Sequence, residues 1–225
     1  MKLEVVYEDN HLLVVNKPFG MLSQGDPSGD TCVFEEAKTY IKTTYHKPGN
    51  VYIGLVHRLD RPVGGLMVLA KTSKAAARLS RMFQEKQVAK IYHAITERIP
   101  SPSQGTLIHY MKRAVKGKNI QRAFDKPLHG TKKAILEYKL LKKNEHRALL
   151  EVYPVTGRQH QIRVQLSRIG CTIMGDVKYG KSAFNFDQSI ALMAVELSFQ
   201  HPVRNQPVTF RVPYPNNEIW EPFHS

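Results

Sequence analysis

The residues of this 225-residue sequence best suited to chemistry form one short cluster, His57-Arg58-Leu59-Asp60-Arg61, with Gly64-Gly65 just beyond it. Two arginines flank the Asp60 carboxylate and favour its ionised form, in which it can serve as a nucleophile or a base. The glycine pair lacks Cβ atoms and allows a close approach of substrate or chain. The cluster indicates a catalytic carboxylate, although a structural turn with a surface ion pair would use the same residue types.

A second cluster is Thr156-Gly157-Arg158-Gln159-His160-Gln161-Ile162-Arg163. We expect Gly157 to lie just before a helix over 158–169, whose first N–H groups would suit a phosphate. Arg163 follows Ile162 at the edge of the apolar stripe, a position typical of a partly buried arginine paired with a carboxylate. The alternative is an ordinary solvated amphipathic helix.

The third cluster is Lys90-Ile91-Tyr92, inside a strand predicted over 88–96. Lys90 and Tyr92 share one face of that strand because side chains alternate with period two. Tyr92 is either a sheet aromatic or a ring that stacks on a nucleic-acid base.

Metal and cofactor motifs are not found in the sequence. It has no CxxC, no HExxH and no histidine pair at i, i+4, so we expect no metal site. It also has no GxGxxG and no GxxxxGK[ST], so we expect no nucleotide cofactor.

The charge distribution predicts a polyanionic partner. The chain holds 33 Lys and Arg against 19 Asp and Glu, a net charge of +14. Residues 71–147 alone carry 19 basic and 5 acidic side chains, so the whole excess lies in the middle third. Such a local excess favours a nucleic-acid surface over lysines kept for solubility.

Hydrophobic periodicity predicts many short strands and few helices, which indicates an α+β fold with a mixed, mainly antiparallel sheet. We expect helices over 31–45, capped by Thr31, over 73–86, capped by Ser73, and over 158–169. The segment 100–131 is rich in Pro, Gly and Lys, and we expect mostly loop with a short strand near Leu107. No linker-like break divides residues 1–225, so we expect one domain with two lobes around a cleft. The strands are predicted over 3–7, 12–15, 65–70, 88–96, 134–141, 148–153, 190–199 and 208–212.

The remaining composition indicates a soluble, cytoplasmic protein, with a monomer as the expected state. Cys32 and Cys171 are too few for a disulfide framework, and the charged N-terminus has no apolar signal core. No apolar run approaches the roughly 20 residues that a membrane-spanning helix needs.

Four motifs in this order and spacing resemble the RluA-type pseudouridine synthases. They are Asn16-Lys17-Pro18-Phe19-Gly20 (N-K-P-x-G in the family), His57-Arg58-Leu59-Asp60 (H-R-L-D), Lys90-Ile91-Tyr92 (K-x-Y) and the run Gly157 to Val164 (G-R-x-H-Q-I-R-V). Gly175-Asp176 and Tyr179-Gly180 are similar to the family's G-D-x-x-Y-G. The resemblance spans about residues 5–212.

This resemblance implies the pseudouridine synthase fold and the isomerisation of uridine in a structured ribosomal or transfer RNA without any cofactor. It implies that Asp60 is the catalytic residue, that Tyr92 contacts the flipped base and that Arg163 pairs with Asp60. The RNA-binding side chains that we expect are Arg58, Arg61, Lys90, Arg158, His160, Lys112, Arg113, Lys116 and Lys118.

The sequence departs from the family in three respects. Val63-Gly64-Gly65 replaces the usual Thr-Ser-Gly, Gln165 stands where the family often has His, and we expect no S4 domain, which some members carry, ahead of the N-K-P motif. Two other functions stay open at this stage. One is an RNA-binding protein of the same fold without catalysis, and the other is a metal-dependent nuclease using His57, Asp60 and His160.

Overall fold

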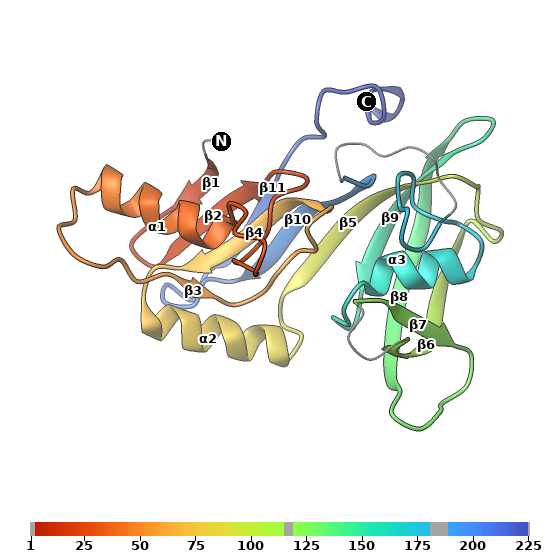
Figure 1. The fold of residues 1–225 in the computed structure, drawn as a ribbon, viewed down its shortest axis with the longest axis horizontal. Coiled ribbons are helices and arrows are strands. Elements are labelled where there is room, and N and C mark those ends of the chain that lie inside the picture. The colour runs from red at the N-terminus through yellow and green to blue at the C-terminus, as the bar shows by residue number, and fades with distance from the viewer. Residues whose placement is uncertain (1–2, 115–118, 181–188, 225) are drawn as a thin grey trace. The chain divides into compact units, whose positions relative to one another are not determined.

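The computed structural model describes residues 3–114, 119–180 and 189–224 and divides into two compact units (Figure 1). The first unit comprises residues 1–90 and 194–213, and the second comprises 91–193 and 214–225. The chain passes between the units inside β5 (Ala89–Thr96), inside β10 (Leu192–Gln200) and after β11 (Pro207–Arg211).

The strands of the first unit follow the order β1-β2-β4-β10, with β3 beside β4 and β11 beside β10. β1 pairs antiparallel with β2, β2 with β4 and β10 with β11. Every residue of β4 is buried, as the uninterrupted apolar run Leu66 to Ala70 requires. The bounds are β1 (Glu4–Glu8), β2 (Leu12–Lys17), β3 (Gly54–Leu55) and β4 (Gly64–Ala70).

Two helices belong to the first unit, α1 (Val33–Thr44) and α2 (Ser73–Gln84). Both were predicted, but each cap was assigned to the wrong residue. Thr72, not Ser73, caps α2 by accepting a hydrogen bond from the Ala75 amide at 3.2 Å. α1 begins after Cys32, and no side chain caps its first turn. Cys32 itself forms an isolated β-bridge with Leu22.

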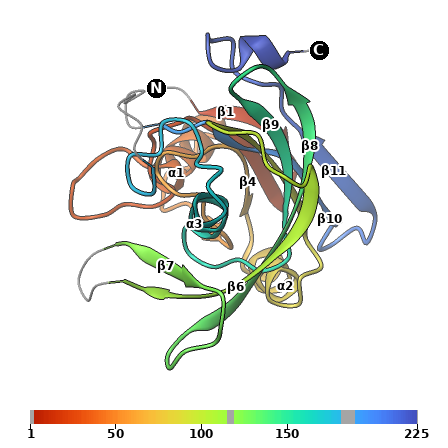
Figure 2. The same cartoon turned by 90° about the vertical axis from the view of Figure 1, so that its right-hand side faces the viewer.

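The strands of the second unit follow the order β5-β9-β8-β6-β7, and the β5–β9, β9–β8, β8–β6 and β6–β7 pairs are antiparallel (Figure 2). The sheet is therefore mainly antiparallel and the helices are few, which confirms the predicted α+β class. Their bounds are β6 (Gln104–Arg113), β7 (Gln121–Phe124), β8 (Lys132–Lys143) and β9 (Ala148–Pro154), with α3 (Gln161–Arg168) and a short 3-10 helix (Glu221–Phe223).

The strand predicted near Leu107 is confirmed as part of β6, but the prediction of mostly loop over 100–131 was wrong, because β6 is ten residues long and β7 follows it. His109 and Met111 of β6 alternate with more exposed neighbours, and Met111 forms a small core with Ala123 of β7. The period-two pattern of β6 and β7 was missed because only one face of the hairpin is apolar and the segment contains many lysines. Pro100, Pro102 and Pro127 lie outside both strands, where they interrupt no pairing.

Helix α3 also begins later than predicted. His160 has a φ of 54°, in the left-handed region, and the helix starts at Gln161. Gly157 therefore does not lie at the helix N-terminus, and the phosphate site predicted there was wrong. The Gln161 side chain instead accepts hydrogen bonds from the Arg158 amide (2.9 Å) and the Thr156 hydroxyl (2.8 Å), which fixes the turn before the helix.

Among the described residues, no helix is both long enough and apolar enough to cross a membrane.

The glycine pair after Asp60 is explained by packing within the first unit. A Cβ on Gly64 would lie 2.4 Å from a ring carbon of Phe19, and one on Gly65 would lie 2.2 Å from the Ala194 carbonyl oxygen. Gly65 also has a φ of 108°. The Phe19 ring therefore fills the space that a serine at position 64 would need, which accounts for the departure from Thr-Ser-Gly.

We predict that Gly64→Ser lowers the free energy of unfolding by about 1–3 kcal/mol, because the new side chain overpacks against Phe19. In a Phe19→Leu background the same substitution should cost at least about 1 kcal/mol less, since the two sites are in contact. Urea unfolding of the four proteins measures this coupling. Gly49→Ser is the control, because a Cβ there meets no atom within 4 Å. Equal costs in both backgrounds would contradict the packing argument.

Candidate active site

Asp60 lies in the loop between β3 and β4, and the backbone of this loop is fixed on both sides of it. The Val63 amide donates to the Asp60 carbonyl at 3.0 Å and closes a turn. The buried Ser23 hydroxyl donates to the Leu59 carbonyl (2.7 Å) and accepts from the Leu59 amide (3.0 Å). One side chain thus satisfies both backbone groups of the residue before Asp60.

Lys17 holds the other side of this loop. Its side chain is fully buried, and its Nζ donates to the carbonyls of Pro18 (2.9 Å), Met21 (2.7 Å) and Arg61 (3.1 Å). Three acceptors match the three N–H bonds of an ammonium group, so the buried charge is fully hydrogen-bonded. Lys17 therefore joins the N-K-P-F-G turn to the residue that follows Asp60.

Burial and two charged neighbours together set the pKa of Lys17. Burial lowers the pKa of Lys17 from 10.5 to about 7, the nearby Asp60 carboxylate raises this pKa, and the Arg61 guanidinium lowers it. The Asp60 carboxylate therefore lies close enough to Lys17, within the same unit, to favour the ammonium form of this buried side chain.

His57 anchors the loop to β4 as a neutral imidazole. Its Nε2 accepts a hydrogen bond from the Val68 amide at 2.9 Å, and its ring stacks on Phe83 with centroids 4.6 Å apart. Burial, with a smaller effect of the Lys90 ammonium, lowers the pKa of His57 from 6.5 to about 3. Because the Nε2 lone pair is occupied, this nitrogen is not a metal ligand, which weakens the nuclease alternative.

The two arginines beside Asp60 differ in their surroundings. Arg61 donates from Nε to the Gly20 carbonyl (3.0 Å) and pairs with Asp30 at 2.8 Å. Arg58 is exposed, and its guanidinium donates to the Gln24 side chain at 3.3 Å. Arg58 is therefore the more accessible of the two predicted RNA contacts.

Arg163, on α3 of the second unit, is buried and pairs with the carboxylate of Asp176, while the pairing with Asp60 that the family resemblance implies stays a prediction. It binds Asp176 through two parallel hydrogen bonds, Nε to Oδ2 at 2.7 Å and one terminal nitrogen to Oδ1 at 2.8 Å. Asp176 also accepts the amides of Lys178 and Tyr179. This fork-like geometry fixes the plane of the guanidinium group.

Tyr179 connects Arg163 to the β6–β7 hairpin. The centre of its ring lies 5.2 Å from the Arg163 guanidinium carbon. Its hydroxyl accepts from the Gln121 amide of β7 at 2.9 Å and shares a 2.5 Å hydrogen bond with Nδ1 of the buried His160. The Gln121 side chain donates to Gln159 at 2.8 Å. Hydrogen bonds thus join the β6–β7 hairpin to Gln159, which precedes Arg163 in sequence, and to Tyr179, which follows it.

The structure places the other predicted RNA-binding residues as follows. Tyr92 lies opposite Val152 in the β5–β9 pair. Lys90, in β5, is half-buried, and burial lowers its pKa. Arg158 is exposed and donates to the Lys133 carbonyl at 3.1 Å.

The remaining predicted RNA-binding residues belong to the β6–β7 region. Lys112 lies 5.5 Å from the centre of the Phe124 ring, and Arg113 is exposed opposite Gln121. Lys116 and Lys118 lie outside the described residues.

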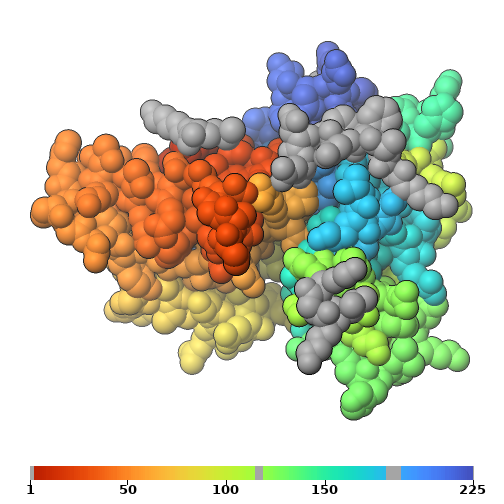
Figure 3. Space-filling view, in the orientation of Figure 1, coloured from red at the N-terminus to blue at the C-terminus, as the bar shows by residue number. Residues whose placement is uncertain are grey.

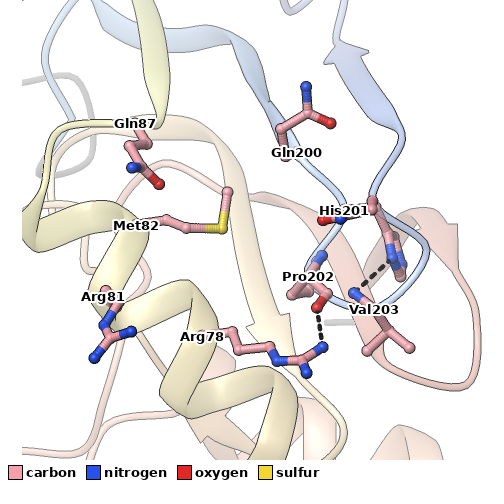
Figure 4. A pocket seen from close by; sticks show the side chains of 9 residues that line it. Arg78, Arg81, Met82, Gln87, Gln200, His201, Pro202 and Val203 are labelled. Atoms are coloured by element: carbon pink, nitrogen blue, oxygen red, sulfur yellow. Dashed lines mark hydrogen bonds between the residues drawn. The ribbon is translucent and has the colours of Figure 1, made fainter.

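The first unit also has a hollow of about 500 Å³ between α2 and the β10–β11 turn, which no predicted site residue lines (Figure 4). Arg78 points across it to the Pro202 carbonyl, to which it donates at 2.6 Å. Arg81 lies 3.9 Å from Glu85 on the same helix. Both arginines of this hollow are therefore already engaged by protein groups.

Comparison with known proteins assigns the fold to a family. The family model for RNA pseudouridylate synthase matches residues 11–168, which include the Asp60 loop and Arg163. The chain belongs to this family.

Two curated relatives are ribosomal large subunit pseudouridine synthase D of Zymomonas mobilis, 34% identical over 96% of this chain, and synthase C of Rickettsia prowazekii, 35% identical over 78% of this chain. The chain spans 70% of the first relative and 56% of the second. The solved structure of human RNA pseudouridylate synthase domain containing 4 is 26% identical, covers 95% of this chain and 89% of its own, and superposes with a TM-score of 0.79.

Several residues that support the site were not identified from the sequence. Lys17, Asp176 and Tyr179 lie in recognised motifs, but their contacts could not be deduced from spacing. Ser23 lies in no motif, and its isolated hydroxyl gave no signal. Its role depends on a hydrogen bond across 36 positions of sequence, which only the fold reveals.

We predict that the wild-type protein gains stability relative to Lys17→Met as the pH rises from 7 to 9. The folded chain releases the Lys17 proton near pH 7, whereas the unfolded chain keeps it until about 10.5. The free energy of unfolding therefore rises with pH in this window, by up to about 1.4 kcal/mol per unit.

Urea unfolding at the two pH values measures the difference between the two proteins. If Lys17→Met does not fold, NMR titration of the wild-type Lys17 amine gives the same information. A constant difference, or an amine that titrates near 10.5, would contradict the account.

Proposed function

We propose that this protein is an RNA pseudouridine synthase in which Asp60 is the catalytic carboxylate. The observation that carries the proposal is the construction of the Asp60 loop. Ser23 fixes the residue before Asp60, Lys17 fixes the residue after it, and the family match covers both. A carboxylate on a backbone that is fixed on both sides is suited to act on one positioned atom.

The proposed reaction is an isomerisation of uridine. The C1′–N1 glycosidic bond breaks, the uracil turns, and C1′ joins C5; C5 loses its proton and N1 gains one. No electrons or phosphoryl groups are exchanged, so the reaction needs no cofactor. The target nucleotide must leave its stack, because its reacting carbons are inaccessible inside a helix.

Each predicted site residue has a proposed role. Asp60 acts on the flipped uridine as nucleophile or base. Tyr92 stacks on the uracil and, in this proposal, takes the C5 proton. Arg163 pairs with Asp60 and keeps it ionised, with Asp176 fixing the guanidinium plane. Asp60 belongs to the first unit and the other two to the second, so we propose that residues 1–225 work as one catalytic domain.

The substrate that we propose is a structured ribosomal or transfer RNA. The printed names of the relatives include ribosomal large subunit and transfer RNA pseudouridine synthases. The basic excess of residues 71–147 supports a polyanionic substrate. We propose a cytoplasmic monomer that binds RNA through Arg58, Lys90, Arg158, Lys112 and Arg113, with Arg61 and His160 supporting these contacts from within the protein.

Asp60→Asn is predicted to abolish turnover on a uridine-containing RNA while leaving its dissociation constant within about three-fold of wild type. The amide keeps the shape but loses the charge and basicity, and no phosphate contact is removed. Mass spectrometry of the RNA product and a filter-binding assay measure the two effects. Asp26→Asn, which neutralises an exposed carboxylate of the same unit, is the matched control and should retain turnover. Full activity of Asp60→Asn would refute the catalytic assignment.

Replacing Lys112 and Arg113 with Ala is predicted to weaken RNA binding and to flatten its salt dependence. Each lost phosphate contact reduces the slope of log K against log salt by about 0.7–0.9. The measurement is a series of RNA binding constants at increasing salt concentration. An unchanged slope would show that these two side chains do not contact phosphates.

A further inference from the structure

The second unit contains a groove of about 700 Å³ between β7 and α3 that no predicted catalytic residue lines. Figure 2 shows the β6–β7 hairpin beside α3, and in Figure 3 the green atoms of this hairpin region and the cyan atoms of α3 adjoin on the face shown. This volume is in the range of pockets that hold small ligands, including a single nucleotide. The groove is lined by, among others, Arg122, Phe124, Lys126, Leu128, Arg168 and Tyr179.

The groove is positively charged. Arg122 and Lys126 are exposed, and neither makes an ion pair or a side-chain hydrogen bond with any residue that the structure describes. Arg168 is bound to Asp125 by two hydrogen bonds, of 3.3 and 2.5 Å, so this pair cancels its own charge. Lys112 adds a further cation close to the Phe124 ring. Two unpaired cations thus flank a half-buried aromatic ring.

The groove also offers apolar surface and an open strand edge. Leu128 is 49% exposed and supplies apolar surface to the groove. β7 is the last strand in the order of the sheet. The Gln121 amide bonds to Tyr179 rather than to β6, so by the alternation of antiparallel pairs the Ala123 N–H and C=O also point away from β6. These groups face the edge of β7, beside which the order of the sheet places no other described strand.

We propose that this groove binds one unstacked nucleotide of the RNA substrate, separate from the target uridine. Its base would stack on Phe124 and contact Leu128, and the adjoining phosphates would pair with Arg122 and Lys126. Cations interleaved with an aromatic ring are the recognition pattern of single-stranded RNA. That the bound polymer is RNA rests on the proposed function. The groove would give this RNA a second site of contact with the protein, besides the site of the target uridine.

The position of the groove links it to the catalytic arginine. Tyr179 lines the groove, its ring adjoins Arg163, and its hydroxyl bonds to the hairpin and to His160. A nucleotide in the groove would therefore lie against the residue that connects the hairpin to Arg163. An extended peptide added to β7 is the competing occupant, and the unpaired cations favour RNA over it.

The test uses fluorescence anisotropy with a labelled, unstructured RNA oligonucleotide of about ten nucleotides, at several salt concentrations. Phe124→Leu should weaken binding by at least about five-fold without changing the salt slope, because it removes a stacking platform and no charge. The double variant Arg122→Gln/Lys126→Gln should reduce the salt slope by about 1.4. The matched control is Lys139→Gln/Lys143→Gln, two exposed lysines outside the groove, which should keep the wild-type slope.

Thermal melting verifies that each variant is folded, and ultraviolet cross-linking to wild type should label the peptide that contains Phe124. Wild-type affinity and slope in both groove variants would overturn the groove assignment while leaving the proposed function intact. Failure of the wild-type protein to bind RNA would overturn both. Loss of binding to an extended acidic peptide in Phe124→Leu, with RNA affinity unchanged, would assign the groove to a protein partner and overturn the proposal.

Discussion

The buried amino group of Lys17 is the interaction on which the candidate site most depends. It binds the carbonyls of Pro18 and Met21 and that of Arg61, which is 44 positions from Lys17 in sequence, and it does so near the Asp60 carboxylate. A fully buried lysine is costly unless every N–H finds an acceptor, so the backbone around it must keep its conformation. The turn that carries Asp60 is therefore held by an electrostatic requirement as well as by the Ser23 hydrogen bonds. The Phe19 ring packed against Gly64 completes the enclosure within the same unit.

In the second unit, too, a buried charged side chain is held by hydrogen bonds, here in the Arg163–Asp176 pair. Asp176 holds the Arg163 guanidinium in a fixed plane, and two backbone amides hold Asp176. Tyr179 then bonds this pair to the β6–β7 hairpin, where much of the basic excess lies. The hairpin that we propose to bind RNA and the Arg163–Asp176 pair are thus parts of one hydrogen-bonded network.

The sequence was sufficient for the α+β class, for most strands and helices, and for the burial and carboxylate pairing of Arg163. These features depend on local periodicity and on motifs read directly from the chain. Sequence failed where tertiary contacts decide the outcome: the β6–β7 hairpin hides its one apolar face among lysines, Cys32 replaces Thr31 at the start of α1, and the left-handed His160 delays α3. Ser23 could not have been predicted, because its function exists only once Leu59 lies against it.

The central claim is that this chain converts specific uridines to pseudouridine through Asp60. Its most direct test is a pseudouridine map of total RNA from cells that contain the wild-type chain, lack it, or carry only the Asp60→Asn form. The account predicts that at least one pseudouridine disappears when the chain is absent, returns with wild type and does not return with Asp60→Asn. Identical maps in all three cells, or restoration of the lost site by Asp60→Asn, would contradict it.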